Sequence, residues 1–376
     1  MSDTVKIVHI IIGLGVGGAE RFLSRLIGSH SDDPRFDHTV VSLTTLGVIG
    51  KELEDSGTTV YCLGLTSSIG LFKLLPRLYK ILRKINPNVV HCWMYHSDLI
   101  GGLVAKLLGI KKILWGVRNT SLEQGGTRTK RLLQKTCAFL SGVIPDKIIC
   151  VAYSAYESHK KIGYNESRMI VINNGYEINR FQYSNEARAH IRSGFCLDES
   201  LILIGSVGRF SPAKDHFGFI EAAADAYKKN QSLRFMMIGR DVNQENSALY
   251  QSIIEAGIDH VCMLIGEVSN INDFMSAMDI FCLHSETEGF PNVLGEAMCV
   301  GLPCIATDVG DAGYLIKSTG KLVPPKNISA LSGAMLSMAE LEASARCALG
   351  VEARKRIVEH FSLDSSVRKF TEVYCA

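Results

Sequence analysis

Short apolar runs alternate with longer amphipathic stretches through the first half of the chain. The runs are rich in Ile, Val and Leu, which is typical of parallel strands that are buried on both faces. They lie at residues 6–12, 38–43, 59–63, 88–93, 112–117, 147–151 and 169–172. Between them, apolar residues recur with helical spacing, for example at residues 18–27, 71–85, 98–108 and 129–140. The pattern predicts an α/β domain in which helices cover a parallel sheet.

The second half of the chain repeats this pattern. Its predicted strands lie at residues 201–207, 233–238, 261–265, 280–283, 303–306 and 321–323, with helices of matching length between them. The turn signal Asn173-Asn174-Gly175 and the irregular residues 176–184 separate the two halves. We therefore predict two doubly wound parallel-sheet domains, at residues 1–180 and 181–360.

Length and composition agree with two globular domains. The chain has 376 residues, of which 47% are hydrophobic and 21% are charged. Lysines interrupt the best candidate for a membrane span, residues 99–117. The run at residues 5–12 follows Asp3 rather than basic residues, so we interpret it as a strand and not as a signal peptide. The 11 cysteines show no metal-binding spacing, which is typical of reduced thiols in the cytosol.

A glycine-rich loop follows the first predicted strand directly. The sequence Gly13-Leu-Gly-Val-Gly17-Gly18 satisfies the G-x-G-x-x-G pattern of dinucleotide-binding loops. That fingerprint also requires an acidic residue at the end of the second strand, where this chain has Ser42-Leu-Thr-Thr45. NAD binding is therefore disfavoured, and a tight turn or contact with phosphate or sugar remain as the other interpretations.

Two acidic residues bracket the start of a predicted helix in the second half. Glu288 lies in the loop before the helix, and Glu296 lies inside it, at the edge of its apolar face. Pro291 suits the first helical position, and Gly301 ends the helix. A half-buried carboxylate needs a partner, which is either a structural cation or the hydroxyl groups of a ligand. Because the first turn adds free N–H donors, the mixture suits a polyhydroxylated ligand, with a structural helix-capping pair as the alternative.

The motif Glu288-Gly-Phe-Pro-Asn-Val-Leu-Gly-Glu296 resembles the signature of the retaining family-4 glycosyltransferases of GT-B fold. The resemblance implies two Rossmann-like domains that face each other across a cleft. The first would bind the acceptor and the second a nucleotide-sugar donor, and the last helix, within residues 361–376, would pack back on the first domain. Glu296 would hold the ribose, while Glu288 would orient the transferred sugar. The other donor-binding positions implied are Gly17, Gly18, Gly289, Phe290, Pro291, Asn292, Val293 and Leu294.

Two cations follow the first strand of the second domain. In Gly208-Arg209-Phe-Ser-Pro-Ala-Lys214, both lie where the strand's carboxyl end would meet a phosphate. In the resembling family the matching pair holds the donor's diphosphate, so Arg209 and Lys214 would stabilise the charge that develops on the leaving group. No Asp-x-Asp motif stands in a matching place, and we expect neither a metal nor another cofactor. The alternative is that both cations are solvated surface charges.

A histidine follows the fourth strand of the first domain. The resemblance implies that a histidine near this position contacts the transferred sugar and takes part in catalysis with Glu288, Arg209 and Lys214. His96 opens the following helix and is the candidate, while His91 belongs to the strand, and the sequence does not decide which of the two lines the cleft. A structural histidine is the alternative.

Basic residues are concentrated in the first half, which holds 23 basic and 14 acidic side chains against 17 and 24 in the rest. Most of the excess lies between Lys73 and Lys135. Such a region suits an anionic membrane surface and a lipid-linked acceptor. Nucleic acid is disfavoured, because no nucleic-acid module is present and aromatic residues do not interleave with the cations.

Together these features predict a retaining, metal-independent glycosyltransferase of the hexosyltransferase type, peripheral at the cytoplasmic face of the membrane. It would move a sugar from a nucleoside-diphosphate sugar to a glycan or lipid-linked acceptor in cell-surface polysaccharide or glycolipid synthesis. The alternatives are a GT-B enzyme that is not a transferase, such as an epimerase or phosphorylase, a scaffold without activity, and an NAD-dependent oxidoreductase. The sequence names neither the sugar, the base, the acceptor nor the oligomeric state.

Overall fold

The computed structural model of the chain describes residues 4–65, 71–118 and 128–376. They form two compact units. Unit 1 comprises Met1–Asn174 with Asp364–Ala376, and unit 2 comprises Gly175–Leu363. The first crossing between the units lies in the Asn-Asn-Gly turn that the sequence marks, and the second lies next to the start of the last helix.

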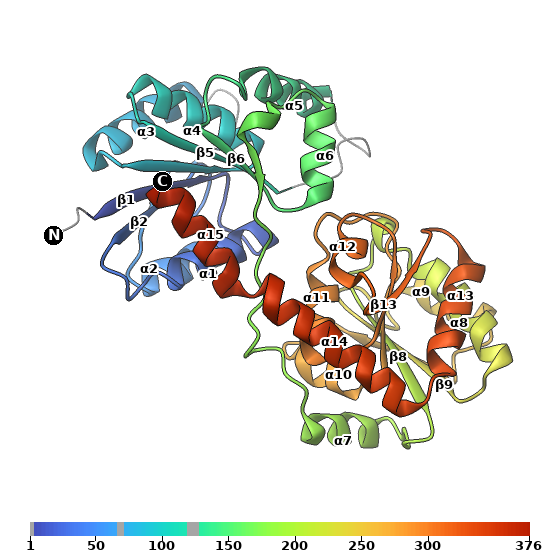
Figure 1. Cartoon of the computed structure of the whole chain (residues 1–376). Helices are drawn as coiled ribbons and strands as arrows, with labels where there is room; N and C mark the ends of the chain where they lie inside the picture. The colour runs from blue at the N-terminus through green and yellow to red at the C-terminus, as the bar shows by residue number, and fades with distance from the viewer. Residues whose placement is uncertain (1–3, 66–70, 119–127) are drawn as a thin grey trace. The chain divides into compact units, whose positions relative to one another are not determined.

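Unit 1 is built on a parallel sheet with the strand order β3-β2-β1-β4-β5-β6-β7. The strands are β1 Val5–Ile11, β2 Phe36–Ser42, β3 Thr59–Cys62, β4 Val89–Trp93, β5 Lys112–Val117, β6 Lys147–Cys150 and β7 Met169–Val171. The helices are α1 Gly18–Gly28, α2 Gly47–Asp55, α3 Leu71–Ile85, α4 Tyr95–Leu107, α5 Arg128–Leu140, α6 Tyr153–Lys161 and α15 Leu363–Cys375. Helices α3, α4 and α5 cover one face of this sheet, and α1, α2 and α15 lie on the other (Figure 1).

Unit 2 is built on a second parallel sheet with the order β10-β9-β8-β11-β12-β13. Its strands are β8 Ile202–Val207, β9 Leu233–Ile238, β10 Cys262–Gly266, β11 Ile280–Leu283, β12 Cys304–Thr307 and β13 Gly320–Val323. Its helices are α7 Asn185–Gly194, α8 His216–Lys229, α9 Ser247–Glu255, α10 Ile271–Ala277, α11 Asn292–Val300, α12 Ala312–Ile316, α13 Ile328–Ala339 and α14 Ala343–Phe361. Its main core lies between the sheet and helices α8, α9 and α13.

The predicted fold class is confirmed. Every predicted strand is present, and its ends differ from the prediction by at most about two residues, which is the usual uncertainty of such boundaries. Helix α4 is the largest difference among the named helices, because it begins at Tyr95 rather than near residue 98. Met94 precedes it with a positive φ of 70°, which turns the chain sharply from β4 into the helix.

Each sheet reverses its strand order once, between β1 and β4 in unit 1 and between β8 and β11 in unit 2. At such a reversal the loops leaving the two central strands part to opposite sides, and the crevice beyond their carboxyl ends is the usual ligand site of doubly wound sheets. The order of the strands therefore marks one candidate site in each unit before any side chain is considered.

A chain of three histidines, the buried His9 and His30 with the half-buried His38 between them, connects α15 to the sheet of unit 1. The indole N–H of Trp93 donates to His9 Nδ1 at 3.2 Å, so His9 carries its proton on Nε2. His9 Nε2 lies 2.9 Å from His38 Nδ1, and His38 Nε2 lies 3.0 Å from His30 Nδ1. His30 Nε2 then meets the hydroxyl of Thr371 on α15 at 3.0 Å. Because each ring accepts at one nitrogen and donates at the other, all three imidazoles are satisfied as neutral rings.

Burial keeps these rings neutral. It lowers the pKa of His9 well below its usual value, and the neighbouring histidines lower it further. Burial and then His30 lower the pKa of His38 to about 3. The pKa of His30 is also lowered, chiefly by burial; Asp33 opposes this shift and Arg35 adds to it.

We expect acid to weaken unit 1. The unfolded chain takes up protons on these histidines near pH 6.5 while the folded unit does not, so stability is lost as pH falls from about 6.5 toward the folded value of about 3. The free energy of unfolding should fall by up to about 1.4 kcal/mol per pH unit for each such histidine. Urea unfolding followed by tryptophan fluorescence measures this, because both tryptophans, Trp93 and Trp115, lie in unit 1.

The variant His38→Gln should reduce the slope of stability against pH between pH 7 and pH 5. The matched control is His260→Gln, which changes an exposed histidine of unit 2. Equal slopes in the wild type and His38→Gln would contradict the conclusion that the linked histidines are neutral in the folded protein.

Candidate functional site

The loops that leave β8 and β11, the two strands at the reversal in unit 2, carry charges of opposite sign. Lys214 ends a short 3₁₀ turn, Pro212–Lys214, after β8, and Glu288 lies in the loop after β11. The Lys214 ammonium lies 2.5 Å from Glu288 Oε1 in an ion pair whose side chains are 22% and 14% exposed. The Ser285 hydroxyl donates to the same oxygen at 2.6 Å. The fold thus brings together two predicted site residues that are far apart in the sequence.

His284, the residue after β11, holds the two loops in register. Its Nδ1 lies 3.2 Å from the carbonyl oxygen of Asp215, and its Nε2 lies 2.5 Å from the Ser206 hydroxyl. Since a carbonyl only accepts, Nδ1 carries the proton and Nε2 accepts from Ser206. Burial, followed by the charge of His216, lowers the His284 pKa to about 3, so the ring stays neutral. The backbone N–H of Glu286 adds a bond to the Ala213 carbonyl at 2.9 Å.

Gly310 supports the loop that carries Glu288. Its φ is +55°, and a Cβ atom at this position would collide with the carbonyl oxygens of Gly289 and Glu288. The next residue, Asp311, donates its N–H to the Gly289 carbonyl at 2.9 Å. The Glu288 loop therefore packs directly against the backbone of residue 310, where only glycine fits.

Helix α11 starts one residue later than the sequence predicts. Pro291 was expected at the first helical position, but its ψ of 88° places it before the helix, where its carbonyl accepts from Leu294 at 3.1 Å. No side-chain hydrogen bond caps this N-terminus. Gly301 ends the helix in the left-handed conformation, as expected.

Glu296 lies half-buried on α11 beside the aromatic ring of Tyr176. The Tyr176 ring packs against Gly295, where any side chain would overlap it, and stacks on Phe290 with the ring centres 5.9 Å apart. Its hydroxyl is buried with no hydrogen-bond partner among the described residues. Burial, followed by the Glu296 charge, raises the Tyr176 pKa well above its usual value. Tyr176 thus forms one wall beside Glu296, although the sequence places it in an irregular stretch.

Arg209 is exposed, in contrast to Lys214. Arg209 follows β8 and lies three residues before the start of the 3₁₀ turn. The side chain of Lys214 packs over Gly208, the residue before Arg209, where a Cβ atom would lie 3.3 Å from Lys214 Cδ. Arg209 is therefore an exposed positive charge, whereas Lys214 is held by its ion pair with Glu288.

In unit 1 the glycine loop lies at the corresponding reversal between β1 and β4. Gly17 is the N-cap residue of α1 and Gly18 its first residue, and no side chain caps this end. The carboxylate of Glu20 lies so close to Gly17 that a side chain at that position would overlap it. An acid in the first turn already complements the positive end of the helix, so this loop suits a neutral sugar better than a phosphate.

His91 in β4 and His96 in the helix that follows it differ in accessibility. His91 is completely buried in β4, and its Nδ1 lies 2.9 Å from the hydroxyl of Tyr374. His96 lies exposed in the first turn of α4, at the carboxyl side of the same strand. Of the two, His96 is the one that a ligand could reach, and its catalytic role stays a prediction.

No cluster of three or more His, Cys, Asp or Glu side chains that could hold a metal ion occurs in the described part of the chain. The groups at the reversal of unit 2 are instead two cations, two carboxylates and the free amides of a helix start. This set can bind an anion and several hydroxyl groups at once.

Comparison with known families decides which chemistry this arrangement serves. The sequence model described as "Glycosyl transferases group 1" matches residues 188–356, and the one described as "Glycosyltransferase Family 4" matches residues 16–180. Together the two matches cover most of both units. The chain belongs to the group 1, or family 4, glycosyltransferases.

Similar proteins support the assignment of the chain to this family. It is 23% identical over 378 residues to the UDP-Gal:alpha-D-GlcNAc-diphosphoundecaprenol alpha-1,3-galactosyltransferase of Escherichia coli, covering 98% of this chain and 96% of that one. It is 26% identical to the capsular polysaccharide biosynthesis glycosyltransferase CapM of Staphylococcus aureus, covering 83% and 84%. Among solved structures, Anabaena Alr3699/HepE in complex with UDP has the same fold, with a TM-score of 0.86, 18% identity and coverage of 98% and 99%.

Sequence reasoning missed three residues that shape the candidate site in unit 2. Ser285 and His284 lie next to the acidic motif, and their polar character at the end of a buried strand was a usable signal. Tyr176 gave none, because its contact with Gly295 joins residues 119 positions apart only through the fold.

We expect Gly310→Ala to disturb the candidate site more than the fold. The new methyl group would strain a left-handed backbone and push on the Glu288 loop, so ligand binding in unit 2 should weaken by about tenfold or more, while stability falls by about 1–3 kcal/mol. Nucleotide titration and urea unfolding measure the two effects. The control is Gly257→Ala, which also has positive φ, +71°, but meets no atom near its added Cβ. Equal effects of both changes on ligand binding would contradict the support role of Gly310.

Proposed function

We propose that the protein is a retaining, metal-independent glycosyltransferase that moves a sugar from a nucleoside-diphosphate sugar to a lipid-linked glycan acceptor. It would act in the synthesis of a cell-surface polysaccharide or glycolipid. The observation that carries this proposal is the Lys214–Glu288 pair at the strand reversal of unit 2, with Arg209 at its rim and Glu296 on the adjoining helix.

The cations suit the leaving diphosphate. Lys214 has three N–H donors, so it can keep its bond to Glu288 and still donate to a phosphate oxygen. Arg209, being exposed, can close over the same group. Negative charge grows on the diphosphate as the sugar–phosphate bond breaks, and fixed cations that are already in place stabilise it without reorganisation.

The carboxylates suit the sugar and the ribose. Glu288 Oε1 is occupied by Lys214 and Ser285, which leaves its second oxygen to accept from sugar hydroxyls. The amides of Phe290, Asn292 and Val293 around the start of α11 would donate to sugar oxygens, and Glu296 would accept from the ribose. With no protein nucleophile in this scheme, the leaving phosphate takes the proton of the acceptor hydroxyl on the same face, which gives retention.

The relatives guide the choice of donor and acceptor. The Escherichia coli relative is named for a UDP-sugar donor and a diphosphoundecaprenol acceptor, and the Anabaena structure contains UDP. We therefore propose uridine as the donor's base and a polyprenyl diphosphate-linked saccharide as the acceptor.

The helices on one face of unit 1 suit a membrane surface. No helix among the described residues is long and apolar enough to cross a bilayer. Helices α3, α4 and α5 lie side by side and carry large exposed apolar side chains among exposed cations. The apolar ones include Leu107, Leu132 and Phe139, of which Phe139 is 85% exposed, and the cations include Lys80, Lys84, Lys106, Arg131 and Lys135. Such a mixture supports peripheral attachment to anionic lipid at the cytoplasmic face.

The first test is thermal unfolding with UDP, GDP, ADP, dTDP, CMP and NAD, without added metal. We expect UDP to stabilise the protein, by about 2.7 kcal/mol when its concentration is a hundredfold its Kd. Stabilisation by NAD alone would favour an oxidoreductase instead, and no stabilisation by any nucleotide would contradict a preformed donor site. With the stabilising donor, the anomeric configuration of the product, read by NMR, tests retention.

Kinetics of two variants test the roles of the charged groups. Lys214→Ala should lower kcat by about 10²–10³, because it removes a group that stabilises the developing charge. Glu296→Ala should mainly raise the KM for the donor, because the ribose contact is the same in the ground and transition states. Lys229→Ala, at an exposed lysine of unit 2, is the control. Normal kinetics in both site variants would reject the assignment.

Sedimentation with vesicles tests the membrane surface. The protein should bind vesicles that contain phosphatidylglycerol more tightly than those of phosphatidylcholine. The double variant Lys80→Gln/Lys84→Gln should lose about 1 kcal/mol per cation removed. Lys51→Gln, an exposed lysine on α2 of the same unit, should bind as the wild type does. Equal binding to both kinds of vesicle would contradict electrostatic attachment through this surface.

A further inference from the structure

A second cavity lies in unit 2, away from the candidate donor site. Its volume is about 760 Å³, within the range of about 300–1,000 Å³ typical of small-molecule sites. Its floor is formed by Met278, Leu302 and Pro303, which precede β11 and β12. It therefore opens at the amino ends of the strands whose carboxyl ends carry Glu288 and Gly310. The two sites cannot share a ligand, because the sheet separates them.

One wall of this groove is the long helix α14. Gly350 of α14 packs directly on the backbone of Gly301, at the end of α11, where any side chain would overlap it. This close approach fixes the helix and leaves Val351 and Val358 lining the groove, 58% and 42% exposed. Apolar side chains line most of the cavity.

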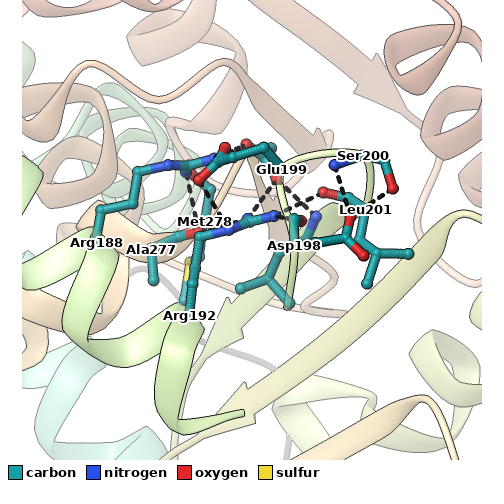
Figure 2. Close-up of polar contacts among 10 residues, drawn as sticks. Arg188, Arg192, Asp198, Glu199, Ser200, Leu201, Ala277 and Met278 are labelled. Atoms are coloured by element: carbon teal, nitrogen blue, oxygen red, sulfur yellow. Dashed lines mark hydrogen bonds and ion pairs between the residues drawn. The ribbon is translucent and has the colours of Figure 1, made fainter. Parts of the chain in front are cut away.

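Arg188 of helix α7 and Tyr183, just before that helix, line the opposite wall. Arg188 and Arg192 anchor α7 to the residues before β11 (Figure 2). Arg188 donates to the Asp279 carboxylate at 2.9 Å and to the Ala277 carbonyl at 3.1 Å. Arg192, only 2% exposed, bonds the other oxygen of Asp279 at 3.0 Å. Both arginines hold α7 in place, and the carboxylates of Asp279 and Glu199 neutralise their charges. This side of the groove therefore carries no net positive charge.

The α14 side of the groove is positively charged. Arg346 donates to the carbonyls of Ala339 and Leu341, and Arg354 donates to those of Phe181 and Cys299. Carbonyl oxygens satisfy N–H donors without neutralising the charge of the guanidinium. Lys355 is exposed and makes no ion pair with any described residue. Glu359 is the one acidic group that lines this side.

We propose that this groove binds an anionic membrane lipid, with one hydrocarbon chain along the apolar side chains of α14 and the phosphate beside Arg354 and Lys355. A hydrocarbon chain fits because the walls are helices whose backbone groups are already bonded internally, so the groove offers few partners to a peptide backbone. The excess of cations on one side complements a phosphate and not a zwitterionic or neutral head. The inference does not rest on the glycosyltransferase reaction.

Cys347 provides an intrinsic reporter, because this exposed thiol lines the groove. The experiment measures its rate of alkylation by N-ethylmaleimide in the full-length protein, by peptide mass spectrometry. The exposed thiols of Cys62 in unit 1 and Cys196 in unit 2 lie outside the lining and serve as references in the same sample. Lysophosphatidylglycerol, used below its critical micelle concentration, should slow alkylation of Cys347 and leave both references unchanged.

Variants separate the chain from the head group. Val351→Asp/Val358→Asp should abolish the protection of Cys347, while Ile254→Asp, at an exposed apolar position of α9, should keep it. Lys355→Gln should weaken the affinity for lysophosphatidylglycerol, read from the protection of Cys347, by about fivefold, as expected for the loss of one cation near a phosphate. It should not change the weaker effect of lysophosphatidylcholine.

Three results would overturn the proposal. Equal protection by lysophosphatidylcholine and lysophosphatidylglycerol would reject recognition of the anionic head. Unchanged alkylation of Cys347 at every lipid concentration would reject a lipid site. Protection that grows with protein concentration in the absence of lipid would show that a second copy of the chain covers the groove. None of these results depends on nucleotide binding, so they are distinct from a failure of the proposed function.

Discussion

The reversal of strand order between β8 and β11 is the constraint on which the rest of unit 2 depends. It makes two loops from distant parts of the chain leave the sheet side by side, and it leaves a crevice between them. The Lys214–Glu288 pair spans these loops, and His284 bonds to the loop before α8 on the same side. Without this reversal Lys214 and Glu288 would not meet.

A half-buried ion pair is weak evidence for stability, because desolvation offsets much of the attraction between the charges. Under the proposed function, the pair would instead prepare the site for a ligand. Lys214 is held by Glu288, and Glu288 by Ser285, so both charges have fixed positions. The buried, neutral His284 connects the two loops without adding a charge.

The two ends of the sheet in unit 2 are built differently. Polar loops and the uncapped start of α11 gather at the carboxyl ends, where a hydrophilic ligand would bind. At the amino ends, α7 and α14 stand apart over an apolar floor, held by the Arg188 and Arg192 contacts and by the Gly350–Gly301 approach. One sheet can thus carry two chemically distinct sites, because the length of its strands separates their carboxyl ends from their amino ends.

The sequence by itself determined the sheet-and-helix alternation, all the strands and the acidic and cationic motifs, because buried parallel strands and helix ends are encoded by residues close in sequence. It also marked Glu288, Glu296, Arg209 and Lys214 as a set, through local motifs. It could not determine that Lys214 meets Glu288, that Tyr176 fills the space over Gly295, or that His30 reaches Thr371 on α15. Those contacts, like the groove between α7 and α14, join residues far apart in the chain, and only the packing of the sheets decides them.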